Sequence, residues 1–262
     1  MMQLARSQAA GADQDGPVAP VSTARRIIAP IETPAATTAD SGEDGLGKSL
    51  GDRAYDQLLD RMLEGVFAAG TLLQERALAE MLGISRTPVR EALAKLESEG
   101  FVTRHAGRLL VVREVPLQEL MEILHVRAIL ETEAAGIAAG RVGADELRAL
   151  RRLFEAQLQG PLPDGGDFWA ADDRLHGVIV DAAGNAVLAV TVRTLRRRTR
   201  MFNLKRLPER LVPGCHEHLA IVDALERGDG EAARTAMATH LDNTRRSILA
   251  KLEPLSGVRP GA

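Results

Sequence analysis

The spacing of apolar and polar positions predicts a compact group of short elements early in the chain. Residues 71–112 read TLLQERALAEMLGISRTPVREALAKLESEGFVTRHAGRLLVV. A first short helix is predicted to end at Gly83, because glycine is common just past a helix C-terminus. Ser85 is placed to cap a second helix, and Pro88 fits within its first turn. The apolar residues with helical spacing are Leu78, Ala79, Met81 and Leu82 in the first helix and Val89, Ala92, Leu93 and Leu96 in the second.

Elements on both sides complete this group. An earlier helix is predicted to begin near Ser49 or Leu50 and to close at Gly70. Two short β-like runs around Gly107 predict a hairpin, or wing, and VVREVP at 111–116 indicates its last strand followed by a linker. The earlier helix takes its apolar face from Tyr55, Leu58, Leu59, Met62, Leu63 and Val66.

Beyond Pro116 the apolar pattern has a helical period almost throughout, with breaks at glycine, asparagine and proline. No strand-like alternation interrupts it. Six helices without a sheet predict an α-helical bundle of about 140 residues. The fold class is therefore mainly α, with an N-terminal winged helix-turn-helix and an all-α bundle behind it. The predicted helical segments are 117–140, 144–159, 167–183, 186–203, 209–228 and 230–252.

These patterns divide the chain of 262 residues into four parts. Residues 1–47 are rich in Ala, Gly, Pro, Ser, Thr and Asp without a sustained period, and we expect a disordered arm. The winged helix is expected at 48–115, the helical domain at 116–253, and a flexible tail at 254–262.

Composition restricts the class of protein. Hydrophobic residues make up 45% of the chain and aromatic residues only 3%, which favours helices built from Leu, Ala, Val and Ile. The single Cys215 fits a reducing compartment. No apolar run approaches the roughly 20 residues of a membrane span, and the N-terminus lacks the apolar stretch of a secretory signal. We therefore expect a cytoplasmic protein with no membrane partner.

Charge distribution indicates a nucleic-acid partner for the first domain. The whole chain has a net charge of −3, yet residues 76–113 contain seven Arg or Lys against four acids. Arg86, Thr87 and Arg90 lie on the exposed leading end of the second helix, where a recognition helix meets base edges and phosphates. A helix, a glycine turn and a second helix also occur in many α proteins. A generic hairpin would rarely place two arginines and a threonine there, so double-stranded operator DNA is the expected partner.

The segment LAEMLGISRTPVREALAKLESEGFV resembles the N-terminal winged helix of GntR-type bacterial transcription regulators. The resemblance is weaker in the wing, because family members often have a basic residue or histidine directly before the glycine. Here Ala106 stands there, and His105 lies one residue earlier. The resemblance implies DNA contacts at Arg76, Arg86, Thr87 and Arg90, and a wing tip at Gly107.

The second domain contains a set of side chains typical of a metal site. Asp172 and His176 are four residues apart on one predicted helix and therefore share a face. His218 and His240 lie beside the apolar stripes of two further helices. A lone histidine on such a helix is usually a packed or surface residue, so the prediction depends on the set of four. One carboxylate and three imidazoles suit Zn²⁺, Ni²⁺, Mn²⁺ or Fe²⁺.

A second resemblance covers this domain. The patterns D-x-x-L-H…A-A-G-N and E-H-L-A-I-x-D-A-L-x-x-G-D are similar to the helical effector (FCD) domain of the FadR branch of the GntR family, and in particular to its metal-binding subgroup. The neighbours Asp173 and His216 are expected to lie beside the site without binding the metal. The resemblance implies four metal ligands, which are Asp172, His176, His218 and His240.

Arginines in this domain are candidates for binding an acidic effector. Arg127 resembles an arginine that faces the effector pocket of the family, and a guanidinium can hold a carboxylate through two parallel hydrogen bonds. The alternative is a surface salt bridge with Glu131, four residues along. A second group of arginines is expected to be mostly solvated or in an interface, with at most one or two side chains turned inward. These are Arg193, Arg196, Arg197, Arg198 and Arg200.

These observations predict a homodimeric transcription regulator, most simply a repressor, whose helical domain binds a divalent metal and a small organic or sugar acid. A metal sensor without an organic effector is the first alternative. A metal-dependent hydrolase is the second, with Glu217 or Asp173 as a general base. The sequence contains no Gly-rich phosphate loop, His-Glu-x-x-His motif or nucleophile elbow, so we expect that the protein is not an enzyme.

Overall fold

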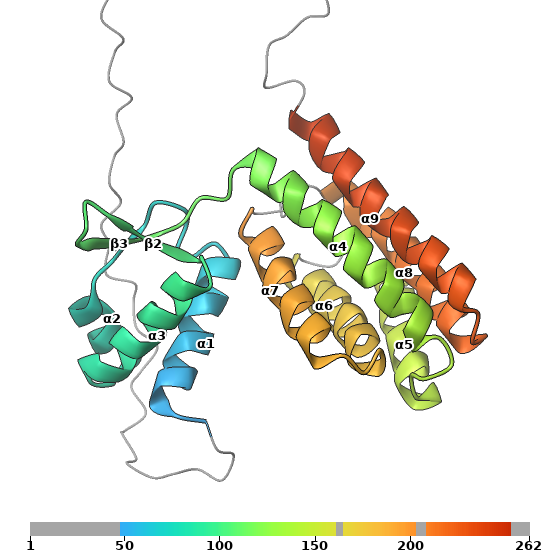
Figure 1. The fold of residues 1–262 in the computed structure, drawn as a ribbon, viewed down its shortest axis with the longest axis horizontal. Helices are drawn as coiled ribbons and strands as arrows, with labels where there is room; N and C mark the ends of the chain where they lie inside the picture. Colours follow the sequence, from blue (N-terminus) through green and yellow to red (C-terminus); the bar gives the residue numbers. More distant parts are fainter. Residues whose placement is uncertain (1–47, 161–164, 203–207, 253–262) are drawn as a thin grey trace, which may run out of the picture.

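The computed structural model describes residues 48–160, 165–202 and 208–252 (Figure 1). The arm expected at 1–47 and the tail expected at 254–262 lie outside these residues. In Figure 1 a small α/β unit lies on the left, and an all-helical unit lies on the right. The predicted fold class, a winged helix-turn-helix followed by a helical bundle, is confirmed.

The N-terminal unit has three helices and a three-stranded antiparallel sheet in the order β1-β3-β2. The predicted helix pair and wing are present, and β1 is an addition that the sequence pattern did not predict. It pairs Leu72 with Val111 and Leu73 with Leu110, which connects the start of the helix pair to the wing. The elements are α1 (Leu50–Leu63), β1 (Leu72–Leu73), α2 (Glu75–Leu82), α3 (Arg86–Ser98), β2 (Val102–His105) and β3 (Leu109–Val112).

The end of α1 corrects one prediction. Ser49 caps the helix as expected, accepting a hydrogen bond from the backbone N–H of Asp52 at 3.0 Å. The helix ends at Leu63 rather than near Gly70, because the chain turns through a positive φ of 80° at Gly65. Val66, predicted to be on the apolar face, is 50% exposed, whereas Phe67 is buried in the core at 2%. The apolar spacing predicted too long a helix because it continues past Leu63 to Val66.

The turn between α2 and α3 forms as its sequence predicts. Gly83 has a φ of 66°, a left-handed conformation that glycine adopts without steric cost. The backbone N–H of Ile84 donates to the carbonyl of Ala79 at 3.2 Å, and that of Gly83 donates to Glu80 at 3.3 Å, the pattern of a Schellman cap. Ser85 stands at the N-cap of α3, although its side chain makes no capping hydrogen bond. The turn thereby fixes the direction of α3 relative to α2.

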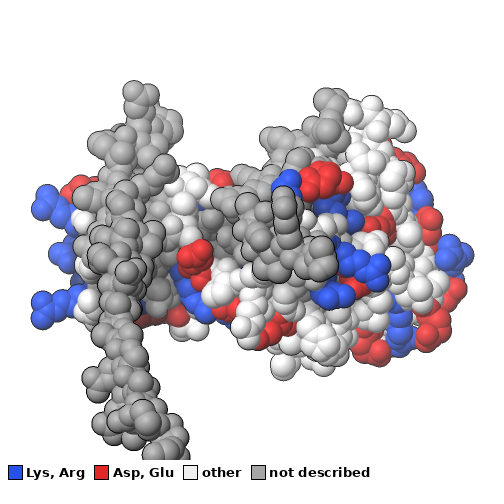
Figure 2. All heavy atoms as spheres, turned by 90° about the horizontal axis from the view of Figure 1, so that it is seen from above, with Lys and Arg blue, Asp and Glu red and all other residues white. Residues whose placement is uncertain are grey.

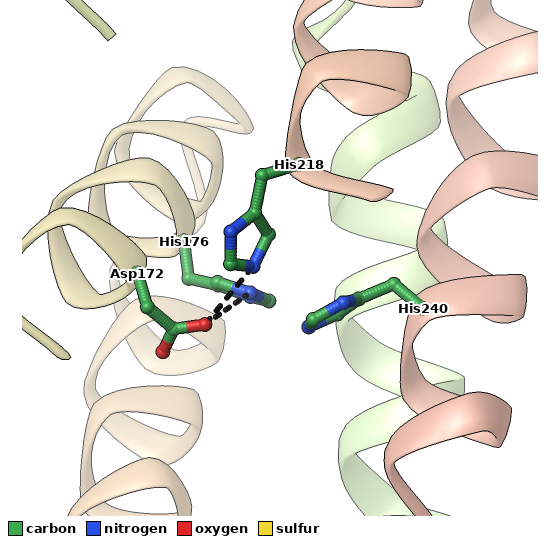
Figure 3. A group of neighbouring side chains, drawn as sticks. All are labelled: Asp172, His176, His218 and His240. Atoms are coloured by element: carbon green, nitrogen blue, oxygen red, sulfur yellow. Dashed lines mark ion pairs between the residues drawn. The ribbon is translucent and has the colours of Figure 1, made fainter. Parts of the chain in front are cut away.

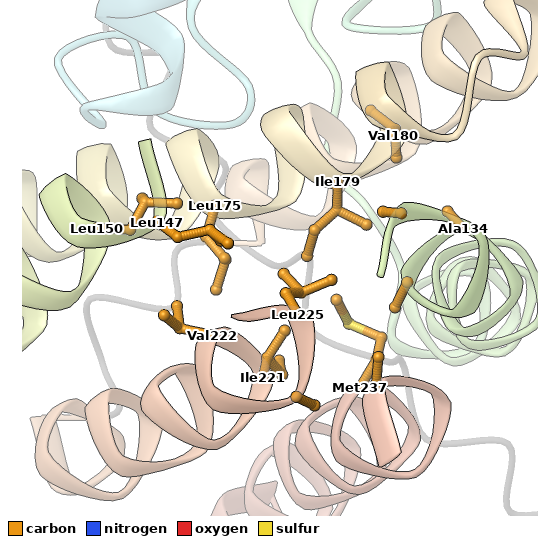
Figure 4. Close-up of a cluster of buried hydrophobic side chains, with 14 of the residues drawn as sticks. Ala134, Leu147, Leu150, Leu175, Ile179, Val180, Ile221, Val222, Leu225 and Met237 are labelled. Carbon is orange, nitrogen blue, oxygen red and sulfur yellow. The ribbon is translucent and has the colours of Figure 1, made fainter. Parts of the chain in front are cut away.

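The C-terminal unit consists of the helices that the sequence predicts, and no strand occurs in its described residues. Its core is a cluster of Leu, Ile, Val, Ala and Met side chains in which Leu175, Ile179, Ile221 and Met237 are fully buried (Figure 4). The helices are α4 (Leu117–Ala138), α5 (Ala144–Gln159), α6 (Gly165–Ala182), α7 (Ala186–Met201), the 3₁₀ turn η2 (Pro208–Arg210), α8 (Leu211–Glu226) and α9 (Gly230–Leu252).

Helix packing brings distant parts of the sequence together. The long helix α4 packs along α9 and also contacts α6 and α7, and α8 lies against α5 and α9. The two units meet where α1 contacts α7. None of the described helices is long and apolar enough to cross a membrane.

Candidate metal centre and nucleic-acid interface

The four predicted ligands converge inside the helical unit (Figure 3). Helix α6 supplies Asp172 and His176 from one face, α8 supplies His218, and α9 supplies His240. One ligand atom from each lies within 4.8 Å of all the others. The histidines His176 and His218 are 0% exposed, and Asp172 and His240 are 5% exposed. Three helices that are separate in the sequence therefore form one enclosed site.

Unpaired polar atoms show that this cluster fits a metal ion. Nε2 of His176 and both ring nitrogens of His218 are buried without a hydrogen-bond partner among the described residues. Nε2 of His218 lies 3.1 Å from Oδ1 of Asp172, and Nε2 of His176 lies 3.7 Å from the same oxygen, yet neither contact has hydrogen-bond geometry. Unpaired buried nitrogens are costly. A metal held at about 2 Å from each donor would need ligand atoms only a few ångströms apart, and those of this cluster all lie within 4.8 Å of one another.

Two carboxylates outside the cluster hold histidine rings in place. Glu131 on α4 contacts Nδ1 of His176 through Oε2. Glu217 contacts Nδ1 of His240 through Oε2 at 2.9 Å. A carboxylate on one ring nitrogen fixes the tautomer and leaves the other nitrogen available to a metal. His176 and His240 are therefore both oriented as metal ligands usually are.

Electrostatics favours the metal-binding forms of Asp172, His176 and His218. Burial lowers the pKa of His218 to about 4, helped by the nearby His240 and His176 and opposed by Asp172. Burial and the Arg196 guanidinium also lower the pKa of His176, against the carboxylates beside it. For Asp172, burial raises the pKa, but Arg196 and the histidines outweigh it and hold the pKa well below its usual range. Neutral imidazoles and an ionised carboxylate are the forms that bind metals.

Arginines connect the cluster to neighbouring helices. Arg127 donates from Nε to Glu131 at 2.6 Å and from Nη1 to Thr199 at 3.3 Å, so the salt bridge with Glu131 forms in the interior and not on the surface. This pair is buried and lies one contact away from His176. Arg196 donates to Asp172 and, at 2.8 Å, to Asp173. Of the five arginines on α7, Arg196 is the one that is buried.

Sequence reasoning missed parts of this site. Glu131 was considered only as a partner of Arg127, and Glu217 only as a general base. Instead, Glu217 accepts hydrogen bonds from Arg210 and Asn243 as well as contacting His240. Burial raises its pKa, but these partners lower it to about 2. The only available signals were the four-residue spacing of Glu131 from Arg127 and the place of Glu217 beside His218. Nothing in the arginine run distinguished Arg196.

The predicted DNA contacts lie on the surface of the first unit. Side chains of Arg76, Arg86 and Arg90 are 84%, 61% and 62% exposed, and Thr87 is exposed beside them. Figure 2 shows basic side chains projecting from the outer end of this unit, whereas both signs of charge mix over the helical unit. Such an arrangement suits a phosphate backbone.

Local contacts shape this surface further. The Glu75 carboxylate holds both Arg90, at 2.9 Å, and Arg86, at 3.3 Å. At the wing, Ala106 and Gly107 have φ values of 51° and 73°. The exposed turn therefore ends β2 sharply and places Gly107 at the tip, although alanine is not favoured in this conformation. Glu75 was not identified from the sequence, because acids are common in a first helical turn for other reasons.

An exposed basic winged helix joined to a helical domain defines the class of DNA-binding transcription regulators. Comparison with known families agrees with this class. Residues 50–112 match the model of bacterial regulatory proteins of the gntR family, and residues 122–243 match the FCD domain. The chain belongs to the GntR family of transcription regulators, and its helical unit is an FCD domain.

Three known proteins illustrate the relationship. A candidate regulatory protein of the L-lactate dehydrogenase operon of Escherichia coli K12 is 32% identical over 225 residues, covering 75% of this chain and 85% of the relative. A probable repressor of the D-xylose utilization operon of Paenarthrobacter nicotinovorans is 30% identical, covering 74% and 86%. The solved structure of E. coli McbR/YncC superposes with a TM-score of 0.68 at 25% identity, covering 79% of this chain and all of that one.

Proposed function

We propose that the protein is a homodimeric repressor whose FCD domain holds one divalent metal ion and responds to a small organic or sugar acid. The observation that carries the metal assignment is the enclosed set of Asp172, His176, His218 and His240 with unpaired ring nitrogens. A buried cluster of this kind in a DNA-binding regulator has no evident purpose unless an ion satisfies it.

The metal would be held by three imidazoles and one carboxylate, a donor set that suits Zn²⁺, Ni²⁺, Mn²⁺ or Fe²⁺. Such an ion supplies positive charge that attracts a carboxylate group of an effector. The name of one relative refers to L-lactate, which is a hydroxy acid, and this supports an acidic effector here. Arg127 would position the metal ligand His176 through Glu131. If the Arg127–Glu131 pair opens, the guanidinium could also bind the carboxylate of an acid directly.

The surface of the FCD domain supports a dimer formed with a second copy of the chain. Helices α4 and α7 contact each other and present exposed apolar side chains on their outer faces. Val126 and Ile129 on α4 are 41% and 59% exposed, and Val187 and Val190 on α7 are 78% and 65% exposed. Large exposed apolar patches mark interaction sites. A self-complementary patch would bring two winged helices to two half-sites, as recognition of a palindromic operator requires.

Arg86, Thr87 and Arg90 at the start of α3 would enter the major groove, with Arg76 and the wing at Gly107 on the flanking backbone. Release from DNA requires that the acid bind more tightly to a dimer whose winged helices no longer fit the operator. The name of another relative describes a repressor, which supports repression as the direction of control.

The second candidate function is a metal sensor without an organic effector. The complete burial of the cluster favours it, because an enclosed ion could stabilise one arrangement of the helices without any further ligand. The two candidates differ in what should change operator binding. A sensor responds to removal of the metal, whereas the effector model responds to an acid while the metal stays bound.

The test begins with DNA selected from a random pool by the purified protein. Fluorescence anisotropy then measures binding to the selected sequence at fixed salt, with and without a chelator and with a panel of hydroxy and sugar acids. We expect a palindromic sequence and at least one acid that weakens binding by roughly tenfold or more. Neutral sugars of the same size serve as controls. Failure to select any sequence would overturn the assignment of the winged helix, and sensitivity only to the chelator would favour the metal sensor.

A further inference from the structure

A cavity of about 430 Å³ lies where the two domains meet, between α1 of the winged helix and helices α6 and α7 of the FCD domain. This volume is within the range of sites for small molecules. Helix α7 lines it with four arginines, whose spacing of i, i+3, i+4 and i+7 places them on one face of the helix. These are Arg193, Arg196, Arg197 and Arg200.

The two walls of the cavity have opposite charge. Across from the arginines, α1 contributes Asp56 and Asp60, which are also four residues apart. Burial raises the pKa of Asp60, and Glu64 and Asp56 raise it further, whereas Arg200 and Arg197 lower it. Asp56 is paired with Lys48 at 2.8 Å, so the attraction across the cavity joins Asp60 to Arg200 and Arg197. This attraction contributes to holding the two domains together.

The α7 wall has cationic capacity for a further anion. Five basic residues line the cavity against three acidic ones. Arg200 is paired with Asp173 at 2.6 Å, and Arg193 is paired with Asp181. Arg197 contacts a neutral group, the hydroxyl of Tyr55, at 3.4 Å. A small anion with two or more charges could bind Arg197 together with a neighbouring guanidinium.

The cavity also borders the proposed metal centre. His176 lines it, and Arg196, which is 6% exposed, separates it from Asp172. On one side of the cavity, a ligand would thus touch the Arg196 guanidinium, which is bonded to the proposed metal ligand Asp172. On the other side, it would touch α1, the first helix of the DNA-binding domain.

We propose that this cavity binds a small polyvalent anion, such as a dicarboxylate, through Arg197 and a neighbouring guanidinium of α7, and that the anion competes with Asp60 of α1 for these arginines. The bound anion and the Asp60 carboxylate of α1 then carry charge of the same sign within one cavity, so the anion repels α1 while it binds α7. The contact between the domains weakens, and the winged helices are free to leave the operator spacing. This inference rests on the proposed function for its regulatory consequence, whereas the binding site itself depends only on the cavity and its arginines.

The test uses calorimetry on the full-length protein with succinate, L-malate and inorganic phosphate as probes, and acetate as the monovalent comparison. We expect at least one divalent probe to bind more tightly than acetate. Arg197→Gln should weaken that binding by roughly tenfold, the loss expected for one charge-assisted hydrogen bond. Arg148→Gln, which removes an exposed arginine of α5, is the control and should bind like wild type.

A second variant separates the proposal from a general loss of folding. Asp60→Asn removes a repelling charge, so it should strengthen binding of the same probe by roughly threefold. It should also reduce the effect of the probe on operator binding. A protein that had merely lost its structure would bind more weakly in both variants.

Binding to the metal-ligand variant His218→Ala distinguishes this proposal from the proposed function. We expect the probe to bind that variant, because the arginine wall does not include the metal ligands. An acid that binds only metal-loaded protein and ignores Arg197→Gln would overturn the cavity site and leave the metal-dependent effector model standing. Absence of binding by all three divalent probes to the wild type would also overturn it.

Discussion

The two functional regions of this protein are built in opposite ways. In the winged helix, the side chains expected to contact DNA are more than half exposed and lie within a short stretch of sequence. In the FCD domain, the side chains of the proposed metal centre are at most 7% exposed and come from three helices, with partners on α4, α7 and α8. The first site presents charge to a large partner, DNA, and we propose that the second encloses a metal ion.

This difference determines what a substitution does. Removing an exposed arginine removes one contact to DNA and leaves the free protein nearly unchanged. Removing one buried ligand also leaves the remaining ligands without a partner, which costs more than the lost interaction itself. The two regions should therefore respond differently to truncation at comparable positions.

The largest effect is expected for His218→Ala. The variant should lose most of its bound metal, and its Tm should fall below that of metal-loaded wild type, because a bound ion stabilises only the folded protein. Elemental analysis and thermal unfolding measure both quantities. The neighbouring His216→Ala is the matched control, since His216 is exposed on the same helix. Equal metal content in the two variants would remove His218 from the site.

A charge on the proposed dimer surface should come next. Val190→Asp places a carboxylate in an apolar interface in both copies, and we expect dimer dissociation to rise by roughly a hundredfold. Sedimentation velocity at several concentrations measures it. Val212→Asp is the control, because Val212 is a valine of α8 that is 41% exposed. A Val190→Asp protein that remains dimeric would place the interface elsewhere.

The winged helix should show a smaller and more specific change. Arg90→Ala is expected to weaken binding to the selected operator by roughly 10- to 100-fold if the side chain reads a base. Its Tm should stay close to that of wild type. Arg148→Ala serves as the control, because Arg148 is also exposed and paired with a nearby carboxylate. Unchanged anisotropy titrations for Arg90→Ala would exclude it from the interface.

The smallest effect is expected for Arg127, which is buried beside the proposed metal centre but is not itself a metal ligand. It tests how a buried residue outside the ligand set differs from an exposed arginine of the winged helix. Arg127→Gln removes the partner of Glu131 and so loosens the ring of His176. Metal affinity should fall by roughly tenfold, the usual consequence of losing an outer partner of a ligand. The response of operator binding to an acid should also be reduced, with effector-free DNA binding intact. Competition with a metal-binding dye provides the affinity.

The sequence predicted the DNA-reading region well because its determinants are local. Gly83, the leading turn of α3 and the wing all follow from short-range rules of capping and periodicity. The same rules failed at the end of α1, where the apolar period continued past Leu63 but Gly65 reversed the chain. The strand β1 was missed because two residues carry no periodic signal, and only their pairing with β3 defines them.

The metal cluster was predictable for a different reason. Its ligand types are rare, and a buried face could be inferred for each helix separately. Their partners were not predictable, because carboxylates and arginines are common on helix surfaces. Arg196 differs from Arg193 and Arg197 only in the direction it faces once α6 and α7 pack together. Charge pairing of this kind depends on tertiary structure rather than on the sequence around each residue.

Native mass spectrometry of the wild-type protein tests the central claim most directly, because it reports the metal and the oligomeric state of the same particle. Our account predicts two chains with two metal ions, and a mass that falls by two ions when the protein is treated with a strong chelator. A protein that contains no metal, and that takes up none of Zn²⁺, Ni²⁺, Mn²⁺ or Fe²⁺ when each is added, would contradict it.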